Sequence, residues 1–85
     1  MATTQWSLKA LKQLRVFPLR DQDAVNKDVK SLESWPDCRN VKALANRSDY
    51  RLRVGRYRVF FCVRQNGTMV IIQVEEVKKR DERTY

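Results

Sequence analysis

The sequence contains no histidine, the side chain that most often acts as a general acid, general base or metal ligand near neutral pH. A serine or cysteine nucleophile would therefore lack its usual partner. The two cysteines, Cys38 and Cys62, do not have the Cys-x-x-Cys spacing of a metal site. We therefore expect no metal and no other cofactor, and we expect both cysteines to be reduced, packed thiols.

Glycines and long apolar runs are also scarce. The only glycines are Gly55 and Gly67, so the chain has no glycine-rich phosphate loop. No apolar run approaches the roughly 20 residues that cross a bilayer, and the N-terminal stretch lacks the apolar segment of a secretory signal. The 85 residues fit a single domain, residues 1–85. The sequence thus predicts a cytoplasmic, one-domain protein without a membrane segment.

Acidic groups are outnumbered, and the formal net charge is +8. Residues 1–49 carry a balance of +3 and residues 50–85 a balance of +5, so the C-terminal part is the more cationic. Clustered positive charge attracts polyanions such as nucleic acid. A cationic surface that serves only solubility is the alternative.

Two helices are expected in the N-terminal half. Ser7 can cap a helix over residues 8–15, which Phe17-Pro18 ends. A second helix is expected to begin at Asp21 or Asp23 and to end before Trp35. The apolar residues at helical spacing are Leu8, Leu11, Leu14, Val25, Val29 and Leu32. The two helices are therefore predicted to form a hairpin that packs on an apolar surface.

The C-terminal half alternates in the way that strands do. Residues 50–63 read YRLRVGRYRVFFCV, two runs of alternating apolar and basic residues around Gly55. An Asn66-Gly67 pair predicts a second hairpin, followed by a strand over Met69–Glu75. Residues 1–6 could add a short edge strand, and residues 38–49 a short strand or a covering loop. The fold class is therefore α+β, with a small antiparallel sheet of 3–4 strands and two N-terminal helices packed on one face.

Arginines stand on one side of these strands. Alternation places Arg51 and Arg53 on the same face, and Arg58 joins them if the two runs pair as a hairpin. Guanidinium groups bind phosphate oxygens in a bidentate manner and stabilise charge that develops on them. Plain solvent exposure is the alternative for these arginines, whereas Tyr50 and Tyr57 lie in phase with the apolar core positions.

The order of two helices, YRLRVGRYRVFF, an NG turn, an apolar strand and the tail VKKRDERTY resembles the RelE/ParE superfamily of toxins from type II toxin–antitoxin systems. The resemblance covers nearly the whole chain and is closest to the RelE branch. It implies a metal-independent endoribonuclease that cleaves messenger RNA in the decoding site of the ribosome. It also implies a cognate antitoxin as partner.

The resemblance assigns roles residue by residue. Arg51 and Arg53 match basic residues that bind the phosphate, and Arg58 matches an arginine that stabilises the transition state. In the tail, Arg80 matches a second such arginine, with Lys79 one register away as the alternative. Tyr85 matches the tyrosine that stacks on or activates the messenger nucleotide. The site residues implied are Arg58, Arg80 and Tyr85 as catalytic, with Arg51, Arg53 and Lys79 binding RNA.

One departure from the family bears on the mechanism. RelE has lysines at the positions of Arg51 and Arg53, and arginine, unlike lysine, does not lose its proton in proteins. The general base would then be Tyr85 or a tail lysine. Two other functions stay open: inhibition of DNA gyrase, as in the ParE branch, and a catalytically weak relic that binds RNA or an antitoxin.

Overall fold

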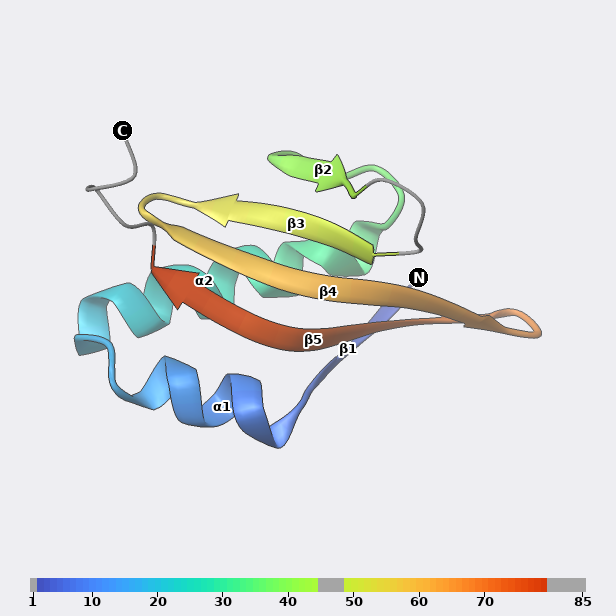
Figure 1. The fold of residues 1–85 in the computed structure, drawn as a ribbon. Helices are drawn as coiled ribbons and strands as arrows, with labels where there is room; N and C mark the ends of the chain where they lie inside the picture. The colour runs from blue at the N-terminus through green and yellow to red at the C-terminus, as the bar shows by residue number, and fades with distance from the viewer. Residues whose placement is uncertain (1, 45–48, 80–85) are drawn as a thin grey trace.

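A computed structural model describes residues 2–44 and 49–79. It confirms the α+β class, with a sheet of five strands rather than three or four (Figure 1). The elements in chain order are β1 (Ala2–Trp6), α1 (Leu8–Arg15), α2 (Leu19–Lys30), the short 3-10 helix η1 (Ser31–Ser34), β2 (Val41–Ala43), β3 (Asp49–Val54), β4 (Tyr57–Asn66) and β5 (Met69–Lys79).

The strands lie in the order β1-β5-β4-β3-β2. Strands β2 to β5 pair antiparallel with their neighbours, whereas β1 runs parallel to β5. Both hairpins have two-residue loops whose first residue is a glycine with positive φ, 56° at Gly55 and 62° at Gly67. Glycine adopts this backbone conformation without the steric cost of a side chain. The predicted hairpins are thus confirmed.

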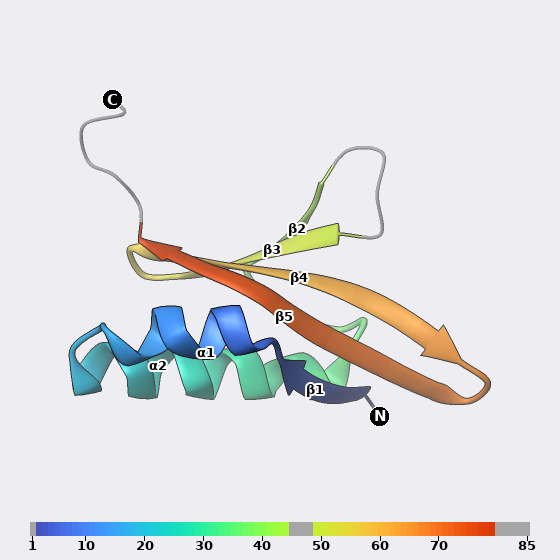
Figure 2. The ribbon, with the colours of Figure 1, turned by 60° about the horizontal axis from the view of Figure 1, so that its bottom comes forward.

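Helices α1 and α2 lie side by side on one face of the sheet, and the described residues place no helix on the other face (Figure 2). Helix α1 begins where expected, because the Ser7 side chain accepts a hydrogen bond of 3.0 Å from the Ala10 amide. Ala10 and Leu14, four residues apart, are its buried residues. No helix in the described part of the chain is long and apolar enough to cross a membrane.

Helix α2 begins earlier than predicted. It starts at Leu19, with the Pro18 carbonyl accepting hydrogen bonds of 2.9 Å from the amides of Asp21 and Gln22. Asp21 was expected as a cap, but its carboxylate instead accepts a hydrogen bond from Tyr57 of β4. The Gln22 side chain donates to the Phe17 carbonyl at 2.8 Å and so closes the turn between the helices.

A bulge in β5 keeps its apolar residues on the helix side. Val70, Ile72 and Val74 alternate as predicted, but the register shifts at Phe60/Phe61 of β4, where Phe60 pairs with Glu76 and Phe61 with Val74. The extra residue, Glu75, resets the alternation, so that Val77 is also buried. The strand continues to Lys79 rather than ending at Glu75.

The core fills the space between the sheet and the helices. Its least exposed large side chains are Val25, Val29, Leu32, Leu52, Val59, Phe61, Ile72 and Val74. Trp35, Tyr50 and Phe61 pack together at one end, with ring centroids 4.7 to 5.8 Å apart, and Phe17 packs on Tyr57 at the other, at 4.4 Å. Tyr50 and Tyr57 thus serve packing, as their phase in the sequence indicated.

Candidate functional site

The uncovered face of the sheet carries a row of three cations, which we call the cationic row: Arg53, Arg58 and Lys78. Arg53 of β3 lies directly opposite Arg58 of β4, which lies directly opposite Lys78 of β5. Opposed residues on one face have Cβ atoms about 5 Å apart, and like charges at that distance repel. Because core packing on the other face holds the strands, this repulsion favours the binding of an anion.

Backbone contacts fix the position of Arg53. Strand β2 is short, but the Arg53 amide donates a 2.9 Å hydrogen bond to the carbonyl of Asn40, just before β2. Asn40 has a φ of 60°, a left-handed conformation that asparagine tolerates. The side chain of Arg53 is exposed, whereas those of Arg51 and Arg58 are partly buried. The predicted grouping of the three arginines on one face is confirmed by the register.

A second row lies beside the first. Lys42 of β2 pairs with Arg51, Arg51 with Phe60, and Phe60 with Glu76 of β5. The ammonium nitrogen of Lys78 lies 5.9 Å from the centre of the Phe60 ring. Arginines, an aromatic ring and a carboxylate are thus adjacent on the same face.

The bulge decides which tail lysine joins the cationic row. Unbroken alternation in β5 would place Lys79 on the uncovered face, but the extra residue exchanges the two faces beyond Glu75. Lys79 pairs with Tyr57, a core position, and Lys78 pairs with Arg58. The structure therefore sets Lys79 apart from Arg51, Arg53 and Arg58, and it adds Lys78, which the sequence reasoning missed. The signal for it was Val77, three residues after Val74 instead of two.

The two other residues predicted for the site, Arg80 and Tyr85, lie outside the described residues. The strand that leads to them ends at Lys79, opposite Tyr57 and next to the Gly55-Arg56 loop. This is the end of the sheet that carries the cationic row. The chain therefore enters its tail from beside Arg58 and Lys78.

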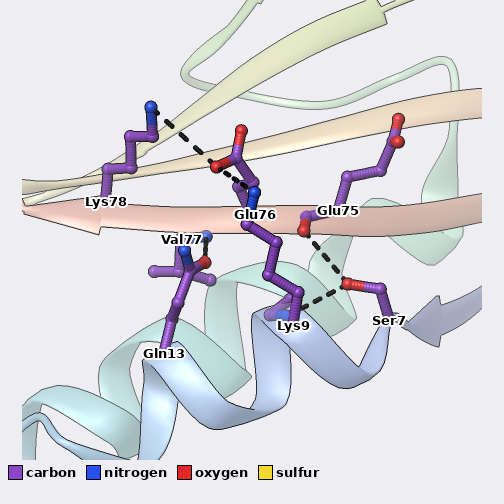
Figure 3. Close-up of polar contacts among 8 residues, drawn as sticks. Ser7, Lys9, Gln13, Glu75, Glu76, Val77 and Lys78 are labelled. Atoms are coloured by element: carbon purple, nitrogen blue, oxygen red, sulfur yellow. Dashed lines mark hydrogen bonds and ion pairs between the residues drawn. The ribbon is translucent and has the colours of Figure 1, made fainter.

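Helix α1 supports the edge of β5 beside the cationic row (Figure 3). Strand β1 stops pairing at Val74, and from there α1 side chains take its place. The Ser7 hydroxyl donates to the Glu75 carbonyl at 3.0 Å, and the Val77 amide donates to the Gln13 side chain at 2.7 Å. The helix thereby satisfies backbone groups that would otherwise lack partners on this edge.

Glu76 organises the cations around it. Its carboxylate lies 3.0 Å from the Lys9 ammonium and 3.9 Å from that of Lys78, and both lysines reach it on the side of β5 away from α1 (Figure 3). The hydrogen bond from Lys9 lowers the pKa of Glu76 below its ordinary value, and Lys78 adds to this. Glu76 is therefore ionised at neutral pH, and its closer partner is Lys9.

Acidic groups lie further along the same face. Asp49, Cys62 and Glu75 bring a thiol and two carboxylates within 4.8 Å of one another. Burial raises the pKa of the Cys62 thiol, and its hydrogen bond to Glu75 raises it further. Burial also raises the pKa of Cys38, and both cysteines are free. Cys62 is thus a protonated thiol that bonds to a carboxylate, and Arg64 lies beside this acidic cluster on the same face.

Two grooves elsewhere do not contribute to the cationic row. One, of about 580 Å³, runs along α1 between Leu8 and Val16, and the other, of about 330 Å³, lies between the end of α2 and the segment before β2. The candidate site is instead the cationic row on the uncovered face. A row of cations across neighbouring strands suits the phosphates of an extended nucleic-acid chain.

No family model and no curated protein sequence matches this chain. Solved structures do match it. One chain of the toxin–antitoxin complex RelBE2 from Mycobacterium tuberculosis is 24% identical, with a TM-score of 0.75 over 93% of this chain and 98% of that one. One chain of the archaeal RelE–RelB complex from Pyrococcus horikoshii is 23% identical, with a TM-score of 0.75 over 95% and 97%.

A YoeB/ParE toxin from Agrobacterium tumefaciens is 13% identical and also matches, with a TM-score of 0.74 over 95% of this chain and 100% of that one. These similarities span both proteins almost completely. The resemblance found in the sequence is therefore confirmed for the fold, which is that of the RelE/ParE toxins.

Proposed function

We propose that this RelE-like chain is the toxin of a type II toxin–antitoxin system and that it cleaves messenger RNA on the ribosome. The observation that carries the proposal is the cationic row, with Arg51 beside it, on the uncovered face of the sheet. The neighbouring folds come from toxin–antitoxin complexes, which supports an antitoxin as the cognate partner. The ribosome and its messenger RNA would be the target, in the cytoplasm.

The reaction would be attack by a ribose 2′-hydroxyl on the adjacent phosphorus. The bond to the 5′-oxygen breaks, and the products are a 2′,3′-cyclic phosphate and a 5′-hydroxyl. Arg51 and Arg53 would hold the phosphate, while Arg58 and Arg80 would stabilise the charge that builds on its oxygens. Lys78 belongs to the same row and would add to the phosphate contacts.

Proton transfer would fall to the tail. Arginine does not act as a base, so Arg51 and Arg53 cannot take the proton of the 2′-hydroxyl. Tyr85 or a tail lysine would accept it; of the described tail lysines, Lys78 lies on the uncovered face and Lys79 does not. Tyr85 would also stack on the messenger nucleotide.

The test is induced expression without an antitoxin, followed by primer extension on a reporter messenger RNA. We expect cuts only within translated regions. Arg58→Ala and Tyr85→Ala should each abolish growth arrest, with cleavage about 100- to 1,000-fold slower for the arginine variant, the usual effect of removing one group that stabilises the transition state. Arg20→Ala, an exposed change on α2, is the charge-matched control and should cleave normally.

Each alternative has its own readout. Both variants should still bind the antitoxin, which shows that they fold. Intact messenger RNA together with a loss of negative supercoiling in plasmid DNA would replace the proposal with gyrase inhibition, the function that the resemblance to the ParE branch left open. Normal growth on expression of the unaltered chain would favour the third function, a catalytically weak protein that binds RNA or an antitoxin.

A further inference from the structure

Phe60 occupies an unusual place for an aromatic side chain. In the part of the chain that the structure describes, the other aromatic residues pack in or against the core, whereas Phe60 does not belong to it. The register places its ring on the uncovered face, between Arg51 of β3 and Glu76 of β5. The ring is only partly buried. Core packing therefore does not explain this side chain.

The distance from the Phe60 ring to the cationic row is about the length of one nucleotide. Phe60 and Arg58 are two residues apart on one strand and one face, a separation of roughly 7 Å. Arg53 is opposite Arg58, and the Lys78 ammonium is 5.9 Å from the ring centre. One ribose joins a phosphate to the base of the same nucleotide, and it can span the distance between Arg58 and Phe60. The face thus offers a phosphate contact and an aromatic surface at matching positions.

Lys78 does not block the ring. Its contact with the ring is at the long limit for a cation–π interaction, and its distance of 3.9 Å to Glu76 is at the long limit for an ion pair. The lysine side chain is 60% exposed. A base that stacks on Phe60 can therefore displace the ammonium toward the phosphate at little cost.

We propose that Phe60 is a stacking platform for one unpaired base of single-stranded RNA, with the phosphate of that nucleotide on the cationic row. This inference rests on the proposed function, since it places the bound RNA on the same face. Sheet-borne aromatic residues bind single-stranded RNA in this way, and stacking of this kind accepts any base because every base has a π-face. Phe60 is thus a positioning residue that sets the register of the RNA on the sheet.

The experiment compares two uncleavable probes with the isolated chain. One is a 2′-O-methyl oligoadenylate of eight nucleotides, and the other is the same backbone without bases. We expect the unaltered protein to prefer the first probe, and Phe60→Ala to weaken binding of that probe by about 5- to 150-fold, the range for one stacked base. Binding of the abasic backbone should be unchanged. Phe60→Tyr should restore the preference.

Controls separate stacking from folding. Ile71→Ala, which removes another partly buried apolar side chain from this face near Arg64, should leave both affinities unchanged. Phe60→Trp should bind normally, and its added fluorescence should be quenched by the oligoadenylate and not by the abasic backbone. This gain of signal does not depend on the stability of the alanine variant.

Three results would overturn the inference: equal affinity of the unaltered chain for both probes, a preference that survives Phe60→Ala, or no quenching in Phe60→Trp. Ribosomal cleavage, assayed in parallel, separates this inference from the proposed function. If the chain prefers the probe with bases but never cuts messenger RNA, the stacking site is upheld and the proposed reaction is refuted. If it cuts messenger RNA but binds both probes equally, the proposed reaction is upheld and the stacking site is refuted.

Discussion

Tyr57 is the residue that ties the helices to the end of the sheet that carries the cationic row. Its side chain is buried, and its hydroxyl donates a 2.5 Å hydrogen bond to the Asp21 carboxylate at the start of α2. Its ring packs on Phe17, in the turn between the helices. The hydrogen bond to Asp21, more than burial, raises the pKa of Tyr57 above its ordinary value of 10.0.

This contact predicts a pH-dependent stability. Tyr57→Phe should lower the free energy of unfolding at pH 7 by about 1.5–3 kcal/mol, the usual net value of a hydrogen bond to a charged group. Because the folded state raises the pKa of Tyr57, the contribution is complete below pH 10.0 and is lost as pH rises through the higher folded value. Urea unfolding of both proteins from pH 7 to 11 measures the difference.

The control for that measurement is Asp21→Asn, which keeps an acceptor and removes the charge. It should reduce the alkaline loss of stability while costing less than Tyr57→Phe at pH 7. A difference between the unaltered chain and Tyr57→Phe that grows above pH 10.0 would contradict the assignment.

Individual residues also show where sequence reasoning reaches its limit. Arg51 and Arg53 could be grouped from alternation, because a period of two fixes the face of each side chain, and the hairpin at Gly55 added Arg58. Lys78 was missed, since one bulge residue exchanges the faces of Lys78 and Lys79 and the spacing of Val74 and Val77 is its one signal in the sequence. Phe60 was overlooked, because its neighbour Phe61 is in phase with the core and a pair of phenylalanines reads as apolar packing.

Along one edge, strand β5 is held by two different elements, β1 and α1. Its first half pairs with β1, and its second half relies on side chains of α1. The Gln13 side chain is the acceptor for the Val77 amide at 2.7 Å. Val77 is buried, and Lys78 follows it directly. The position of Lys78 therefore depends on this edge contact.

Removal of that acceptor should loosen the strand. Gln13→Leu leaves the Val77 amide without its partner, and we expect a loss of roughly 1–3 kcal/mol in the free energy of unfolding. Hydrogen exchange followed by NMR should show faster exchange of the Val77 amide in this variant. The matched control is Lys12→Leu, one residue away on the exposed side of α1, which should leave that amide protected. Equal exchange in both variants would refute the role of Gln13.

The elements that the sequence predicted are those with strong signals in neighbouring residues. The Ser7 cap and the hairpin glycines depend on neighbouring residues, so α1 and both hairpins could be predicted. The sequence near Asp21 does not show that its carboxylate bonds to Tyr57, 36 positions away, instead of capping α2. The parallel pairing of β1 with β5 joins opposite ends of the described chain and has no local signal.

Over the whole molecule, charge is unevenly distributed, with a net of +8 and a cationic row confined to one end of one face. If RNA binds there, the salt dependence of binding should follow this face and not the net charge. Four cations, Arg51, Arg53, Arg58 and Lys78, predict a slope of about −3 for the logarithm of affinity against that of salt concentration, since each neutralised phosphate of a single strand contributes roughly −0.7.

Two variants of equal net charge test this prediction. Arg58→Ala should make the slope shallower by about 0.7. Arg20→Ala, exposed on α2 in the helical layer, should leave the slope unchanged. Fluorescence anisotropy of a labelled oligoadenylate, titrated at several salt concentrations, gives both values. The same slope for both variants would show that the net charge, and not the uncovered face, attracts the RNA.

The parallel pairing of β1 with β5 has a consequence for synthesis. Strand β5 lies between β1 and β4, so the last described strand to be made is an interior strand of the sheet. Until residues 69–79 leave the ribosome, β1 has no neighbour to pair with and the apolar faces of α1 and α2 have only part of the sheet to cover. Lys78, the third member of the cationic row, is made last of all three. The cationic row is therefore incomplete until residues 69–79 have left the ribosome.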